Sequence, residues 1–411
     1  MSEFENKLDK YAETVVKVGL NVQKGQDVYI SVPVYATNFT RKLVKHAYLA
    51  GARQVLVDYV DDEVDLLKYQ LASDEGLKAF PSWKTKGILE MADNNAAFLS
   101  IRPKNPELLK DIDPDRVAMV DKVRRIESKE YSQNYISTGR ISWTLLSYPS
   151  PEWAKLMFPK LTEEEAVEKL WDAMFEVTRI NQENPVDGWK EHIEGLETRA
   201  ELLNEKKYKK LHYKAPGTDL TIELHKDHKW MCANFTNLKG TKFVPNIPTE
   251  EVFTIPHKDG VNGTVTSTKP LVYSGKLINQ FSLTFKEGKV VDFKAEEGYD
   301  ILKNILSIDE GAKFLGEVAL VPYDSPISNS NLVFYDTLYD ENASCHIALG
   351  NALQMCIENV EEKSKEDIDA MGFNRSLTHV DFMIGSAELD IDGETEDGLV
   401  EPIFRAGNWV I

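Results

Sequence analysis

Three short apolar runs constrain the fold of the first third of the chain. They lie at residues 28–32, 54–60 and 96–101. Apolar residues with a helical period precede the first run and connect it to the second. A strand, a helix and a further strand in this order are typical of βαβ units with parallel strands. No GxGxxG or GxxxxGK[ST] motif opens one of these helices, so a nucleotide site of either kind has no support.

A helical segment is expected to follow these strands. Thr162 and Glu165 have the spacing of a capping box, in which each residue bonds to the backbone of the other. Apolar residues recur behind this cap with a helical period, and a second helix is expected after Pro185. We therefore predict an N-terminal α/β domain with a parallel sheet and a helical extension over residues 1–208.

The sequence pattern changes after Lys210. Short β-prone runs are separated by turn sequences, of which Pro216–Asp219 is the first. A later turn, Lys286–Lys289, lies between two β-prone runs and is typical of a β-hairpin. We predict that residues 209–411 form a C-terminal α+β domain with mostly antiparallel β-structure, which carries any catalytic site.

The net charge of −19 excludes some classes of partner. Neither nucleic acid nor an anionic membrane is expected, because both need a basic surface. Hydrophobic residues make up 42% of the chain, too large a share for a disordered protein. No apolar stretch is long enough to span a membrane. Since the first residues lack the apolar core of a secretory signal and the cysteines show no CxxC spacing, the chain is expected to be cytoplasmic.

Acidic residues interrupt two β-prone segments of the C-terminal half. Glu250 and Glu251 precede Val252-Phe253, and on a regular strand they would point to opposite faces. Either both glutamates lie at the surface, or one of them is solvated while the carboxylate of the other points inward. Glu317 stands inside an apolar run, where burying an unpaired carboxylate is costly. This glutamate therefore lies at an edge or binds a cation.

Two histidines and an aspartate are further candidates. Asp340 or Asn342 is expected to cap a helix whose first turns carry His346, which taken alone fits a core histidine as well as a ligand. Strand alternation places His379 and Asp381 on one face. Imidazole nitrogen and carboxylate oxygen suit zinc, cobalt or manganese, although a structural ion pair explains the same two residues.

Together, two glutamates, two histidines and one aspartate form a set that suits two divalent ions. Such sites need a bridging carboxylate with terminal nitrogen and oxygen ligands, and aminopeptidases are among the enzymes that have them. The chain has no HExxH motif, which excludes the usual single-zinc protease pattern. His225 and His228 have a ligand-like spacing but lie in a polar turn, and the serines of 325–330 lack a GxSxG motif. Neither group is expected to carry chemistry.

Several longer motifs occur in a fixed order along the C-terminal half. They are NIPTEEVFT at 246–254, VTSTKP at 265–270, GEVALVP at 316–322, SPIS at 325–328, and the segments 340–350 and 379–385. In this order they resemble the aminopeptidase T / aminopeptidase S family of bacterial dinuclear-metal aminopeptidases, and the resemblance extends over the whole chain. It implies a homodimeric exopeptidase with an enclosed chamber, which removes N-terminal amino acids from peptides with two ions such as zinc or cobalt.

The resemblance also implies roles for individual residues. Carried over by motif, the metal ligands are Glu251, Glu317, His346, His379 and Asp381, with Glu317 as the bridging carboxylate. Glu251 is chosen over Glu250 by its spacing to Glu317, and Glu250 is the candidate general base that takes the proton of the attacking water.

One position departs from the family pattern. Leu353 stands where an HxALGxAY-type run has a tyrosine, seven residues after the histidine. A tyrosine hydroxyl at this position is able to stabilise an oxyanion. The sequence therefore also allows a catalytically impaired, peptide-binding homologue. A metal-dependent hydrolase of another amide bond is a third reading, because a fold can be retained while its substrate changes.

Overall fold

The computed structural model describes residues 2–102, 105, 108–273 and 276–411. Its internal contacts divide the chain into two units. The first runs through His192 and also includes Asn234–Pro248, while the second comprises Ile193–Ala233 and Thr249–Ile411. Helix α9 (Pro185–Lys206) therefore contributes residues to both units. None of the helices in the described ranges combines the length and low polarity that crossing a bilayer requires.

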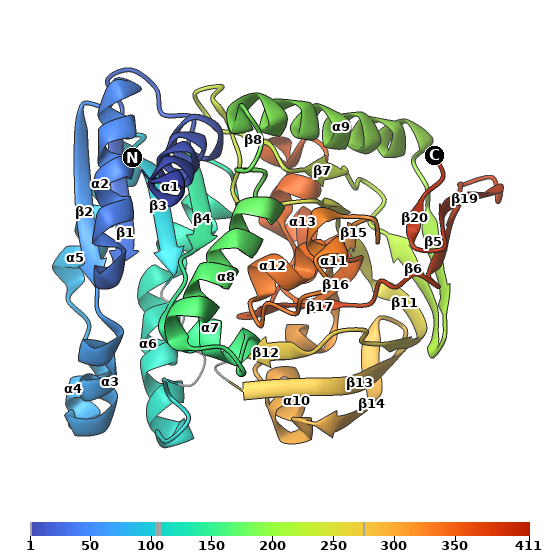
Figure 1. The fold of residues 1–411 in the computed structure, drawn as a ribbon. Helices are drawn as coiled ribbons and strands as arrows, with labels where there is room; N and C mark the ends of the chain where they lie inside the picture. Colours follow the sequence, from blue (N-terminus) through green and yellow to red (C-terminus); the bar gives the residue numbers. More distant parts are fainter. Residues whose placement is uncertain (1, 103–104, 106–107, 274–275) are drawn as a thin grey trace. The chain divides into compact units, whose positions relative to one another are not determined.

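A four-stranded sheet forms the centre of the first unit (Figure 1). Its strands, in the order β2–β1–β3–β4, are β1 (Asp27–Pro33), β2 (Gln54–Val60), β3 (Ala97–Arg102) and β4 (Trp143–Ser147). Each neighbouring pair is parallel. The prediction of an N-terminal α/β domain with a parallel sheet is thus confirmed. A two-stranded ribbon in the same unit pairs β8 (Phe235–Thr236) with β9 (Lys242–Phe243).

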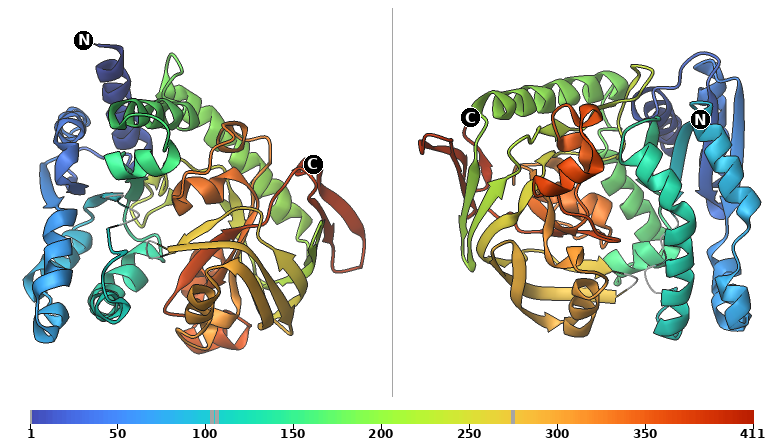
Figure 2. Two further views of the ribbon diagram at one scale, coloured as in Figure 1. Left: turned by 60° about the horizontal axis from the view of Figure 1, so that its bottom comes forward. Right: turned by 180° about the vertical axis from the view of Figure 1, so that it is seen from behind.

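Helices cover both faces of this sheet. Helices α1 (Glu3–Thr14) and α2 (Thr37–Leu49) contact each other on one face, and α5 (Ser82–Asp93) and α6 (Pro114–Tyr131) lie over the other, as the view from behind shows (Figure 2). Among the described residues, the unit also contains α3 (Asp62–Leu71), α4 (Asp74–Lys78), α7 (Pro151–Met157), α8 (Glu163–Val177) and the first part of α9. The predicted capping box at Thr162 is present at the start of α8.

Antiparallel sheets dominate the second unit. The first sheet has the order β17–β16–β15–β10–β7, with bounds β7 (Met231–Cys232), β10 (Val252–Thr254), β15 (Leu315–Leu320), β16 (His346–Gly350) and β17 (His379–Met383). Every pair in it is antiparallel. This agrees with the predicted C-terminal α+β fold, whose helices are α10 (Tyr299–Leu306), α11 (Pro326–Asn329), α12 (Thr337–Asp340) and α13 (Lys365–Ala370).

The second sheet of this unit is larger and has the order β12–β13–β11–β6–β5–β18–β19–β20, with β14 paired to β13. Its strands are β5 (Lys210–Ala215), β6 (Thr218–Leu224), β11 (Pro256–Thr266), β12 (Leu271–Tyr273), β13 (Lys276–Lys286), β14 (Lys289–Glu297), β18 (Asp390–Glu394), β19 (Val400–Arg405) and β20 (Asn408–Trp409). The predicted hairpin is β13–β14. Its two loop residues, Glu287 and Gly288, both have positive φ, as a type I′ turn requires.

One hydrophobic core joins the two sheets of the second unit. Val318, Ile347 and Phe382 of the smaller sheet belong to the same buried cluster as Leu211 and Ile222 of the larger one. Every residue of β15 and β16 is buried. A charged side chain on either strand is therefore out of contact with bulk water, which makes its partners decisive for stability.

Candidate metal centre

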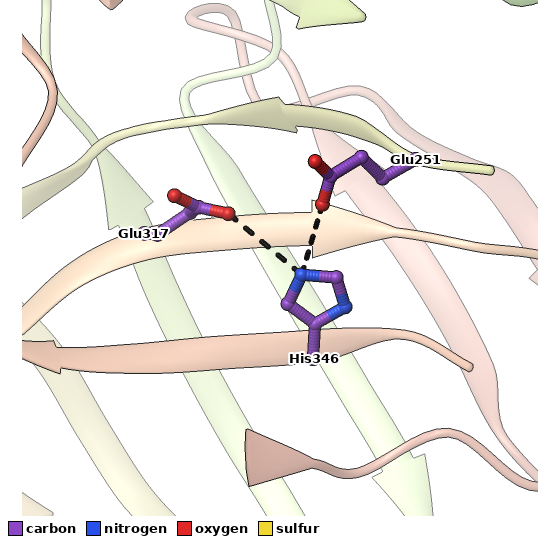
Figure 3. Close-up of side chains that lie close together, drawn as sticks. All are labelled: Glu251, Glu317 and His346. Carbon is purple, nitrogen blue, oxygen red and sulfur yellow. Dashed lines mark ion pairs between the residues drawn. The ribbon is translucent and has the colours of Figure 1, made fainter. Parts of the chain in front are cut away.

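Three of the sequence-predicted ligands meet on neighbouring strands of the smaller sheet (Figure 3). Glu251 directly precedes β10, Glu317 lies in β15 and His346 begins β16. His346 Nε2 lies 3.0 Å from Glu251 Oε2 and 3.7 Å from Glu317 Oε1. The exposed fractions of the three residues are 8%, 5% and 1% in chain order. Two carboxylates and an imidazole thus converge in a buried position.

A β-bulge in β15 places Glu317 on this face of the sheet. Leu315 pairs with Leu349 and Glu317 with the next residue, Ala348, so Gly316 is the extra residue. Without the bulge, Glu317 would share the core face of Leu315. Only glycine fits at position 316, because a Cβ there would lie 2.4 Å from the carbonyl oxygen of Gly350.

Glu317 also belongs to a second group, with His379 and Asp381 of β17. His379 Nε2 lies 3.5 Å from Glu317 Oε2 and 3.3 Å from Asp381 Oδ1. Asp381 and Glu317 both pair with Ala348, whose small side chain leaves space between the two carboxylates. Each carboxylate oxygen of Glu317 therefore faces a different histidine.

The charges of the two groups shift the pKa values of their members. Burial lowers the pKa of His346, but the neighbouring carboxylates of Glu251 and Glu317 outweigh it and hold that pKa well above its usual value. For His379 burial is likewise outweighed, mainly by the charge of Asp381, and the pKa is raised. Burial raises the pKa of Glu317. Both shifts favour the protonated imidazoles, with which a metal ion competes.

The donor atoms fit divalent metal ions. Buried carboxylates stay charged only where cations or hydrogen-bond donors compensate them. Asp381 Oδ1 is buried and accepts no hydrogen bond from the described residues, although His379 Nε2 is close. Each of the two groups combines imidazole nitrogen with carboxylate oxygen, a donor set that suits zinc, cobalt or manganese. The two groups share the carboxylate of Glu317, which suits a pair of ions.

Two sequence expectations near this centre have different outcomes. The prediction that a helix carries His346 is wrong. Helix α12 and the short 3-10 turn η5 (Glu341–Ala343) end before His346, which begins strand β16. The register of β16 between two neighbouring strands outweighs the local capping signals. Glu250 is buried beside Glu251 but belongs to neither group, and its role as a base stays a prediction.

The structure adds Glu341, which the sequence reasoning missed. This residue is 9% exposed, and its pKa is raised well above the usual value by burial and by the negative charges of Asp381 and Glu251. The charges that raise its pKa include one carboxylate from each group. An acidic residue five positions before His346, in a segment that is otherwise buried, was the available signal.

His225 and His228 belong to neither of the two metal-capable groups found within the described residues. Both are buried. The Nδ1 atom of His225 accepts from the backbone N–H of Asp227, while His228 Nδ1 donates to the carbonyl oxygen of His225. Burial lowers the pKa of His225 to about 4 and also lowers that of His228. These imidazoles are neutral structural groups.

The depressed pKa of His225 predicts a loss of stability in acid. The imidazole of His225 takes up a proton below about pH 6.5 in the unfolded chain but only below about pH 4 in the folded chain. The free energy of unfolding is therefore unaffected by this group above pH 6.5 and decreases as the pH falls from 6.5 to 4. The loss amounts to about 3 kcal/mol. Urea unfolding across this range should show a shallower pH dependence in His225→Asn, which keeps an acceptor for Asp227. An unchanged slope would contradict the assignment.

Comparison with known proteins places the chain among metalloproteases. Residues 4–409 match the family model Peptidase M29, described as thermophilic metalloprotease (M29). The chain is 51% identical to Aminopeptidase 2 of Geobacillus stearothermophilus over 409 residues, covering 100% of this chain and 99% of that protein. It is 41% identical to Aminopeptidase T of Thermus thermophilus, with 100% of both chains covered. The solved structure of wild-type AmpT from Thermus thermophilus matches with a TM-score of 0.93 and 40% identity, covering 99% of this chain and 100% of that one.

Proposed function

Since the chain belongs to the M29 family of metalloproteases, we propose that it is an aminopeptidase that uses two divalent metal ions to release N-terminal amino acids from peptides. The observation that carries the two-ion proposal is the position of Glu317. Its two carboxylate oxygens face His346 and His379, one each. This is the arrangement that a carboxylate bridging two cations needs.

The chain supplies a ligand set for each ion. Glu251, Glu317 and His346 would hold the first ion, and Glu317, His379 and Asp381 would hold the second. Glu341, whose pKa is raised by burial and by the charges of Asp381 and Glu251, would supply a further buried carboxylate to balance the ions' charge. When bound, zinc, cobalt or manganese ions lower the pKa of water and polarise a carbonyl group.

Glu250 is the proposed general base. It is buried next to the ligand Glu251, and its backbone N–H donates to Asn342 Oδ1 over 2.6 Å. In this role the Glu250 carboxylate would take the proton of the attacking water and return it to the leaving amine. The negative charges around it also suit the free α-amino group of a peptide substrate.

Metal removal and reconstitution test this function. Metal-free protein is expected to release no leucine from Leu-Gly-Gly, and two equivalents of zinc, cobalt or manganese per chain should restore the release. N-acetylated Leu-Gly-Gly is the matched control, because an aminopeptidase requires the free amine. Full activity with one equivalent would rule out the two-ion mechanism, and hydrolysis of the acetylated peptide would favour a different amide hydrolase.

Leu353 favours a second candidate function, an impaired peptide-binding homologue. It follows β16 at the start of a short 3-10 turn and is half-buried, and its side chain has no hydroxyl to stabilise an oxyanion. Loss of one such donor costs about 10²–10³ in rate. If two ions bind but leucine is not released, Leu353→Tyr should restore turnover; efficient turnover by the natural chain would exclude this candidate.

We also propose homodimeric assembly and a cytoplasmic location, as the family resemblance and the composition suggest. Light scattering of the metal-loaded protein measures the first of these. A mass of one chain, 46.6 kDa, at micromolar concentration would contradict the dimer.

A further inference from the structure

Two buried asparagines lie next to the metal-capable groups without belonging to either. Asn342 has no exposed surface and Asn374 is 1% exposed. A buried amide is costly unless it is hydrogen-bonded, so the partners of such a side chain indicate what it holds in place. Most of these partners are backbone groups of segments that carry the proposed ligands, and Asn342 Nδ2 also lies 3.5 Å from Glu341 Oε1.

Asn342 joins the segment of Glu251 to the segment of His346. Its Oδ1 accepts from the backbone N–H of Glu250 over 2.6 Å, and its Nδ2 donates to the carbonyl oxygen of Leu338 over 3.0 Å. Strand β15 separates β10 from β16 in the sheet, so no ladder connects these two strands directly. The Asn342 side chain bridges this separation immediately before β16 begins.

Asn374 holds the turn that follows β16. Its Nδ2 lies 2.6 Å from the carbonyl oxygen of Gly350 and 2.9 Å from that of Gly311, and the backbone carbonyl oxygen of Asn374 accepts from the Ala352 N–H over 3.0 Å. Between these two contacts lies Asn351, whose carbonyl oxygen is 2.7 Å from His379 Nδ1. A proton on Nδ1 leaves Nε2 free to bind a cation and fixes the plane of the ring.

Building on the proposed two-ion function, we propose that Asn342 and Asn374 are positioning residues that each serve one metal site. Asn342 sets the separation of Glu251 and His346, and Asn374, through the Asn351 carbonyl, sets the orientation of His379. The two side chains use opposite ends of the amide at the critical contact: Asn342 holds Glu250 with its oxygen, and Asn374 holds Gly350 with its nitrogen.

Zinc titration of the metal-free full chain tests this division. Wild-type protein should bind two ions, and Glu251→Gln and Asp381→Asn identify which affinity belongs to which site. Asn342→Ala should weaken the first affinity by about 10–100-fold and leave the second unchanged, whereas Asn374→Ala should do the reverse. The absorption spectrum of bound cobalt reports the same sites independently of turnover.

The aspartate variants separate positioning from general stability. Asn342→Asp keeps the oxygen that accepts from the Glu250 N–H but places a second carboxylate near Glu341 Oε1, so it should recover part of the first affinity. Asn374→Asp lacks the donor and should recover none of the second. Serine replaces alanine at either position if the alanine variant does not fold. Equal weakening of both sites by each variant, or no weakening, would overturn the inference; a wild-type chain that binds only one ion would instead refute the proposed function.

Discussion

Replacing Glu317 by glutamine is expected to reduce kcat/KM for Leu-Gly-Gly by about 10³-fold or more. Its carboxylate oxygens lie 3.7 Å from His346 Nε2 and 3.5 Å from His379 Nε2, so both proposed metal sites share this residue. Glutamine keeps the shape of the side chain but replaces one oxygen with a nitrogen that cannot bind a cation. Metal ions contribute several kcal/mol to transition-state stabilisation, which corresponds to the stated factor.

Metal content distinguishes this effect from unfolding. Glu317→Gln should bind fewer than two ions per chain by elemental analysis and keep the circular dichroism spectrum of the natural protein. Glu366→Gln, an exposed glutamate on α13, is the matched control and should retain both ions and full activity. A Glu317→Gln protein with activity within about tenfold of the natural chain would show that this carboxylate does not bridge.

Local signals account for the parts of the fold that the sequence predicts well. The strand at 54–60, the capping box at Thr162 and the hairpin at Lys286–Lys289 each depend on residues close together in the chain. Turn and cap preferences act over that distance. The order β17–β16–β15–β10–β7 depends on pairings between segments far apart in sequence, which periodicity does not encode.

The site follows the same division between local and distant information. Strand alternation was enough to place His379 and Asp381 on one face, because only their own strand matters. Motif resemblance selected the five proposed ligands. The bulge at Gly316 could not be predicted, since it depends on how β15 meets the turn after β16. Glu341 was missed because its burial among other acidic groups arises only from the sheet order and from the short turn η5.

Replacing Glu250 by glutamine is expected to lower kcat by about 10²–10⁴-fold while both ions and KM are retained, because the amide cannot accept the proton of the attacking water. Glu251→Gln, one residue away, should instead lose the first ion, since Glu251 Oε2 lies 3.0 Å from His346 Nε2. The two variants therefore separate base from ligand at adjacent positions of the same segment. Steady-state kinetics with metal analysis measures both effects. If Glu250→Gln loses an ion and Glu251→Gln keeps both, the two roles are exchanged, and the Asn342 contact to the Glu250 N–H then holds the ligand itself.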